Sequence, residues 1–114
     1  MRWAAILLVP LALAAQAQSK PAGDKEKGKL LLRQFGCGGC HRITGVADAV
    51  GNTGPSLEHF GKRVYIAGLV PNQTDNLVRF IRDPRSVDPR TAMPDLGVGE
   101  AHARDMAAYL EGLE

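Results

Sequence analysis

The apolar positions of the chain are spaced as in α-helices rather than as in strands. In residues 24–35, Leu31, Leu32 and Phe35 lie three and four positions apart, a spacing that gathers side chains on one face of a helix. Asp24 is placed to cap this helix, because its carboxylate can accept hydrogen bonds from the free amides of the first turn. The pattern therefore predicts a first helix over residues 24–35.

Two further helices are predicted in the second half of the chain. One covers about residues 74–82, with Thr74 as its cap and Pro84 as its stop. The other covers about residues 100–113. Their apolar faces consist of Leu77, Val78, Phe80 and Ile81 in the former, and Ala103, Met106, Ala107, Leu110 and Leu113 in the latter. No segment alternates as a strand does, so the predicted fold is all-α, with three main helices.

Glycine and proline are concentrated between these helices. Residues 42–55 are predicted as a loop, and residues 56–60 as a single helical turn that ends at Gly61. Residues 83–97 carry a proline at every fifth position and surround Met93. Because each proline fixes its φ angle, this long segment is predicted to be a stiff loop without secondary structure.

The start of the chain has the pattern of a secretory signal. Residues 3–15 contain no charge, follow Arg2 and lead into the pattern Ala15-x-Ala17. A membrane helix needs about 20 apolar residues, which disfavours the alternative of an uncleaved anchor. The pattern predicts an exported, periplasmic protein with a cleaved signal peptide over residues 1–17, a flexible segment over 18–23 and one domain over 24–114.

Composition narrows the class of protein. Removal of the signal peptide would leave 97 residues with 13 basic and 12 acidic side chains, a net charge of +1. Such a balance argues against a nucleic-acid partner. Those 97 residues hold five aromatic side chains, and the whole chain has 13 glycines and 7 prolines. So small a domain is expected to need a covalent link or a bulky cofactor to complete its core.

Both cysteines lie in the segment Cys37-Gly-Gly-Cys-His41. A structural disulfide here would close a very short loop and stabilise little. A thioredoxin-like pair would follow a strand, and a zinc site needs four ligands where this segment offers three. C-x-x-C-H is the attachment signature of c-type haem, with both thiols on the vinyl groups and the histidine on the iron. Covalent haem is the favoured interpretation, with the redox pair and zinc as alternatives.

A haem bound by His41 has a second axial position on its iron, and the mature chain offers four candidates for it. Met106 belongs to the apolar face of the last helix, and His59 follows His41 by only 18 residues. His102 is expected at the surface. Met93 lies in a segment without packing periodicity, and Met/His ligation raises the haem potential, so Met93 is the favoured ligand.

Five motifs in the expected order resemble those of a class I monohaem c-type cytochrome. They are Cys37-Gly-Gly-Cys-His41, Gly54-Pro-Ser-Leu57, Leu77 to Pro84, Thr91-Ala-Met-Pro94 and Ala107-Ala-Tyr-Leu110. The stretch 63–80 is similar to the cytochrome c module fused to subunit II of some bacterial haem–copper oxidases. The chain differs from that module in Phe80, where the module often has tryptophan, and its sequence includes no copper-binding domain or membrane hairpin.

The resemblance implies a small cytochrome c fold wrapped around one covalently bound haem c. Cys37 and Cys40 would form the thioethers, and His41 and Met93 would be the axial iron ligands. The Pro55 carbonyl would accept a hydrogen bond from His41 Nδ1. The first and last helices would cross at four residues, namely Gly28, Leu32, Tyr109 and Leu110. Two residues are candidates for a haem propionate or for a purely structural role, namely Tyr65 and Asn72.

The resemblance also implies a soluble, exported, monomeric one-electron carrier rather than an enzyme. Two axial ligands would leave the iron no open position for a small-molecule substrate. The implied partners are redox proteins, such as a cytochrome oxidase or a dehydrogenase, with contact to a membrane only through a partner complex. The alternatives are a haem subunit of such a complex and a ligand-binding or peroxide-reactive haem protein.

Charge is unevenly distributed along the chain. Residues 62–90 carry a net charge of +3, whereas residues 91–114 carry −4. One interpretation is an ordinary solvated surface. The other is a basic rim, which includes Arg82 and Arg85, that steers an acidic redox partner.

Overall fold

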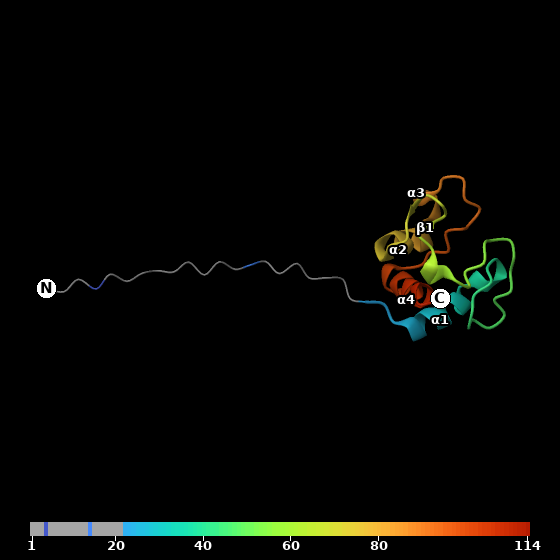
Figure 1. Ribbon diagram of the computed structural model, residues 1–114, viewed down its shortest axis with the longest axis horizontal. Helices are drawn as coiled ribbons and strands as arrows, with labels where there is room; N and C mark the ends of the chain where they lie inside the picture. The colour runs from blue at the N-terminus through green and yellow to red at the C-terminus, as the bar shows by residue number, and fades with distance from the viewer. Residues whose placement is uncertain (1–3, 5–13, 15–21) are drawn as a thin grey trace.

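The computed structural model describes residue 4, residue 14 and residues 22–114. In chain order the elements are α1 (Lys25–Gln34), the 3-10 turns η1 (Cys37–Gly39) and η2 (Phe60–Lys62), the strands β1 (Tyr65–Ile66) and β2 (Val70–Pro71), and the helices α2 (Thr74–Arg82), α3 (Pro84–Val87) and α4 (Glu100–Glu111) (Figure 1). The predicted signal peptide, residues 1–17, lies outside the described residues except at Ala4 and Ala14. Among the described helices, none is both long and apolar enough to cross a membrane.

Helix α1 begins at its predicted cap. Asp24 Oδ1 accepts hydrogen bonds from the amides of Glu26 and Lys27, at 3.0 and 3.1 Å. The amide of Asp24 donates to Oδ1 of Asp105 at 2.8 Å, which ties the start of α1 to α4. The cap residue therefore stabilises both the helix end and its tertiary contact.

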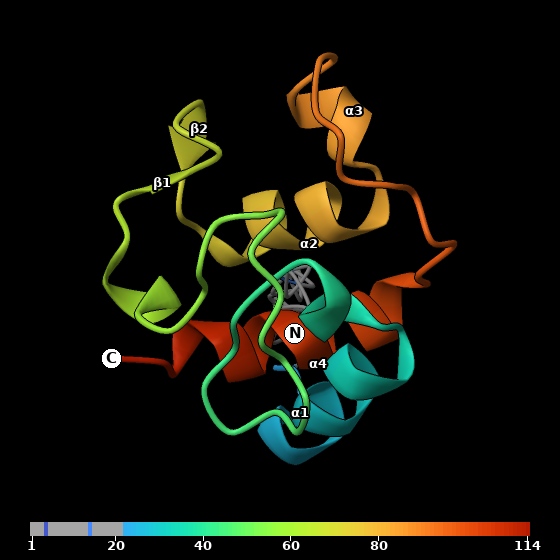
Figure 2. The same cartoon turned by 90° about the vertical axis from the view of Figure 1, so that its right-hand side faces the viewer.

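Helix α4 lies between α1 and α2 and forms the centre of the core (Figure 2). Its Ala103, Met106 and Ala107 are completely buried, and Leu77 and Ile81 of α2 are buried as well. The predicted apolar faces of these helices are thus confirmed, as is the all-α architecture with three main helices.

Helices α1 and α4 make backbone-to-backbone contact at Gly28. A Cβ atom there would lie 1.9 Å from the carbonyl oxygen of Asp105 and 3.0 Å from the amide nitrogen of Met106. Only glycine permits this approach. Gly28 therefore meets α4 about one turn before the predicted Tyr109 and Leu110.

The helix ends differ in detail from the predictions. Thr74 is the first residue of α2 rather than its cap, and the cap position belongs to Gln73, whose side chain makes no capping hydrogen bond. The last helix ends at Glu111 instead of residue 113, although Leu113 still packs against the core. Helix α2 ends at Arg82, where the helical pattern stops.

The prediction of an all-helical chain missed a small hairpin. Strands β1 and β2 pair antiparallel, with Tyr65 opposite Pro71 and Ile66 opposite Val70. The turn between them places Ala67 and Gly68 at positive φ, 52° and 68°. Two-residue strands are too short to show the alternation by which a strand is recognised in a sequence.

Two segments whose structure was predicted from glycine and proline also differ from the prediction. The helical turn expected at residues 56–60 forms instead as η2 at Phe60–Lys62, so Gly61 lies within the turn and does not end it. The segment 83–97 contains the short helix α3, which begins at Pro84. Proline suits the first position of a helix, because the amide it lacks has no partner there.

Candidate functional site

The two cysteines lie on one tight turn directly after α1. Gly36 takes a φ of 74° and turns the chain into η1. The amides of Cys40 and His41 both bond to the carbonyl oxygen of Cys37, at 3.3 and 3.0 Å. Both thiols are free. Burial raises the pKa of the Cys37 thiol, which is half-buried, whereas Cys40 is exposed.

The imidazole of His41 is oriented by the loop that follows it. Its Nδ1 lies 2.7 Å from the carbonyl oxygen of Pro55. Because a carbonyl only accepts, Nδ1 must carry the hydrogen, and in the neutral ring Nε2 then keeps its lone pair. The ring also lies directly on the backbone of Gly54, where a Cβ atom would be 2.5 Å from Cε1.

The loop between His41 and Pro55 packs against the cysteine turn through glycines. The amide of Gly51 donates to the carbonyl oxygen of Gly38 at 3.0 Å, and a Cβ atom at Gly51 would lie 2.4 Å from the carbonyl oxygen of Gly39. A Cβ atom at Gly38 would lie 2.6 Å from Cα of Ala49. Backbone therefore packs on backbone around the thiols, which fixes the turn without bulky side chains.

Met93 lies on the loop between α3 and α4, a segment drawn in orange in Figure 2. Its side chain is half-buried, and its amide donates to Oγ1 of Thr91 at 3.2 Å. Similar local bonds join the amide of Arg90 to Asp88 and the amide of Gly97 to Asp95. The loop thus has a defined path on both sides of Met93.

The other candidate iron ligands are engaged elsewhere. Met106, a residue of α4, is fully buried in the core. Nδ1 of His59 lies 3.0 Å from the carbonyl oxygen of Glu114. His102 is exposed, as predicted, and its ring meets that of Phe35 edge-on, with centroids 6.3 Å apart.

The two propionate candidates differ in their surroundings. Tyr65 is 57% exposed. Asn72 uses its side-chain amide on the backbone: Nδ2 donates to the carbonyl oxygens of Phe60 and Arg63, at 3.2 and 2.9 Å. Its Oδ1 is buried without a hydrogen-bond partner. For Asn72 the contacts favour the structural alternative, because its amide bridges the first residue of η2 and the residue that follows η2.

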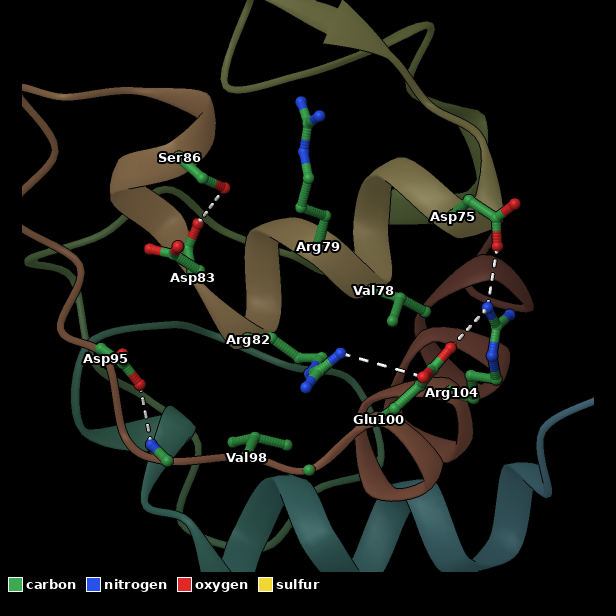
Figure 3. Close-up of a pocket in the computed structure, with 12 residues that line it drawn as sticks. Asp75, Val78, Arg79, Arg82, Asp83, Ser86, Asp95, Val98, Glu100 and Arg104 are labelled. Carbon is green, nitrogen blue, oxygen red and sulfur yellow. Dashed lines mark hydrogen bonds and ion pairs between the residues drawn. The ribbon is translucent and has the colours of Figure 1, made fainter.

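A charged cluster between α2 and α4 was not anticipated from the sequence. The guanidinium of Arg104 lies 2.9 Å from Asp75 on α2 and 3.2 Å from Glu100 on its own helix, and Arg82 lies 3.9 Å from Glu100 (Figure 3). Asp75 raises the pKa of Arg104 further by accepting its hydrogen bond. These residues line a cavity of about 710 Å³. Only the four-residue spacing of Glu100 and Arg104 signalled this cluster in the sequence.

The residues around the cysteine turn fit a covalently attached haem. Two free thiols and an imidazole come from one five-residue segment, and the imidazole presents Nε2 because Pro55 holds its other nitrogen. A hydrogen bond of this kind is typical of metal-binding histidines. For zinc, among the described residues no group of three or more His, Cys, Asp or Glu side chains could hold a metal ion.

Comparison with known proteins agrees with this chemistry. The family model described as Cytochrome c matches residues 25–114. Three relatives are each named "Cytochrome c oxidase subunit 2". The one from Alkalihalophilus pseudofirmus is 30% identical over 103 residues, which cover 90% of this chain and 29% of the relative. Those from Bacillus sp. and Bacillus subtilis are 41% and 28% identical, over 50% and 78% of this chain and 17% and 26% of the relatives.

The chain therefore spans less than a third of the length of these relatives. The family match, by contrast, covers all four helices and the cysteine turn. A covalently bound prosthetic group would supply the bulk that the few aromatic residues of this domain do not, and the cysteine turn is where it would be attached. The chain belongs to the cytochrome c family, and its cofactor is covalently bound, iron-containing haem c.

Proposed function

We propose that this protein is an exported one-electron carrier in which Cys37 and Cys40 hold the haem, and His41 and Met93 bind its iron. When bound, the haem supplies the one-electron redox change at iron. The observation that carries the proposal is the 2.7 Å hydrogen bond from His41 Nδ1 to the Pro55 carbonyl. It fixes the ring plane and makes Nε2 a stronger donor for a metal.

Met93 is proposed as the second ligand because of its place in the chain. It lies on a loop held by local side-chain bonds, and its side chain is half-buried rather than part of the core. Moving Met106 to the iron would empty the centre of the core, where it is fully buried. Met93 can turn toward the iron without leaving a gap in the core.

Ligation by both His41 and Met93 would favour a carrier rather than an enzyme. An iron held by both side chains would offer no position for a small-molecule substrate, and its remaining chemistry would be electron transfer through the haem edge. The role of the chain is then to set the potential through its ligands and the burial of the ring.

A second candidate is a haem subunit of an oxidase complex. It is favoured by the three relatives named as subunit 2 of cytochrome c oxidase. In both cases the proposed partner is a redox protein such as a cytochrome oxidase, and the protein reaches the membrane only through it. A stable complex that co-purifies with the protein would favour the subunit, and a freely exchanging monomer the carrier.

Carbon monoxide distinguishes the carrier from a ligand-binding haem protein. Ferrous holoprotein at neutral pH is expected to keep its absorption spectrum under carbon monoxide, because Met93 would already bind the iron where carbon monoxide would have to bind. Rapid and complete formation of a carbon monoxide adduct by the wild-type protein would contradict the carrier.

A further inference from the structure

We propose that Arg63 is a positioning residue for His41. Its guanidinium holds the backbone at Ser56 and so fixes the Pro55 carbonyl, which accepts the hydrogen bond from His41. This inference rests on the proposed function, in which His41 binds the iron, and goes beyond it by assigning the support of that ligand to a residue outside the haem-binding motif.

The contact lies one residue from the histidine's partner. Nη2 of Arg63 donates to the carbonyl oxygen of Ser56, and the preceding carbonyl, that of Pro55, lies 2.7 Å from His41 Nδ1. The two carbonyls belong to adjacent planar peptide groups that meet at Cα of Ser56, so a shift of the chain at Ser56 would move the Pro55 carbonyl as well.

Apart from the bond from the amide of Phe60 to the carbonyl oxygen of Leu57, at 3.1 Å, the backbone bonds of residues 54–57 hold them to the histidine's own segment. The amide of Gly54 donates to Cys40 at 2.8 Å, and the amide of Leu57 donates to Arg42 at 2.8 Å. Cys40 and Arg42 flank His41 in the chain, so these bonds move together with it. Arg63, at the end of η2, ties the loop to a separate part of the fold.

Arg63 is itself fixed. Its guanidinium lies over the ring of Phe60, 5.6 Å from the centroid, and Phe60 is buried in the core. Its amide donates to the Phe60 carbonyl at 3.1 Å, and its own carbonyl accepts from Asn72 Nδ2 at 2.9 Å. Contacts thus run from the core through Phe60 and Arg63 to Ser56 and the partner of the histidine.

A planar guanidinium suits this role better than an ammonium group. It stacks on an aromatic ring while its N–H groups point in fixed directions, whereas a lysine donor is a mobile point charge. A charged donor to a carbonyl is also stronger than a neutral one. Loss of the guanidinium should loosen the Pro55 carbonyl and weaken the His41 hydrogen bond. His41 would then be a poorer donor to ferric iron.

Arg63→Lys tests the role while keeping the charge. In the ferrous holoprotein we expect hydrogen exchange at His41 Nδ1, followed by NMR, to become about tenfold faster. The reduction potential should rise, because a weaker imidazole donor favours the ferrous state. Arg63→Gln, a second variant that lacks the guanidinium, is expected to accelerate hydrogen exchange at His41 Nδ1 in the same way.

Lys62→Gln is the matched control. Lys62 is the exposed neighbour of Arg63, and loss of its charge should leave exchange at His41 unchanged and lower the potential slightly. The two effects on potential thus have opposite signs. Unchanged exchange in both Arg63 variants, or a fall in the potential of Arg63→Lys, would overturn the inference.

The NMR spectrum of the wild-type holoprotein separates this inference from the proposed function. If His41 binds the iron, the resonances of its ring protons are shifted by the ring current of the haem. A wild-type spectrum without such shifted His41 resonances would contradict the ligand assignment itself. Shifted His41 protons together with unchanged exchange in the Arg63 variants would contradict only the role of Arg63.

Discussion

The ring of His41 packs directly on the backbone of Gly54, where a Cβ atom would lie 2.5 Å from Cε1 and 2.8 Å from Nδ1. The same loop carries the Pro55 carbonyl that accepts from Nδ1. One turn of chain therefore both limits the position of the ring and fixes its hydrogen bond, so residue 54 has no room for any side chain.

Gly54→Ala should displace the histidine or the loop. We expect the free energy of unfolding of the holoprotein to fall by about 1–3 kcal/mol, as for other overpacked sites. Gly39→Ala is the control, because a Cβ atom there has no neighbour within 4 Å. Its effect should stay within about 0.5 kcal/mol in the same urea titration. Equal effects of the two substitutions would show that the Gly54 contact is not limiting.

Removal of both thiols should prevent the domain from folding. Its buried core consists mainly of aliphatic side chains, with Phe60 as the one buried aromatic among the described residues. We expect Cys37→Ala combined with Cys40→Ala to lose most of the helical far-ultraviolet circular dichroism, because the covalent haem is absent from the core. The Gly39→Ala protein, which keeps both thiols, serves as the control. A double variant with the helix content of the holoprotein would refute this prediction.

Export should be required for haem attachment. A chain without residues 1–17, kept in the cytoplasm, is expected to accumulate little holoprotein, because c-type haem is fitted after translocation. The mature protein should begin near residue 18 by N-terminal sequencing, as the Ala-x-Ala pattern predicts. Abundant covalent haem in the cytoplasmic chain, or a mature protein that begins at Met1, would contradict it.

Electron transfer to an acidic partner should depend on salt if the basic rim is real. Arg85→Glu is expected to slow the reaction at low ionic strength, with the difference shrinking as the Debye length falls from about 30 Å at 0.01 M to about 10 Å at 0.1 M. Arg82→Glu should act similarly but also removes a pair with Glu100, 3.9 Å away. A small neutral reductant should react alike with all variants. Unchanged rates at low salt would leave these arginines as ordinary surface residues.

The sequence predicted the long elements and missed the short ones. Helices α1, α2 and α4 start and end within about two residues of the predicted bounds, because each repeats its apolar face over two turns or more. The two-residue strands of the hairpin at 65–71 and the four-residue helix at Pro84–Val87 are too short to repeat a hydrophobic pattern. Their residues therefore carried turn signals that fitted a loop equally well.

In the site, too, the local motif was predicted and the contacts between distant segments were not. The thiols and His41 belong to a single local motif, and the resemblance placed Pro55 beside His41, where the structure has it. The bond from Arg63 to Ser56 and the contacts of Arg104 were not predicted, since they depend on how separate turns and helices pack. The assignment of Met93 to the iron stays a prediction.

The most direct test is the sulfur-to-iron charge-transfer band of the ferric holoprotein, a weak absorption in the near red. We expect the wild-type protein to show this band, and Met93→Ala to abolish it, lower the reduction potential and admit carbon monoxide. Met106→Ala should keep the band and instead cost about 2–5 kcal/mol of stability, because Met106 is fully buried. A band that survives Met93→Ala, or a wild-type protein that lacks the band and binds carbon monoxide readily, would contradict the account.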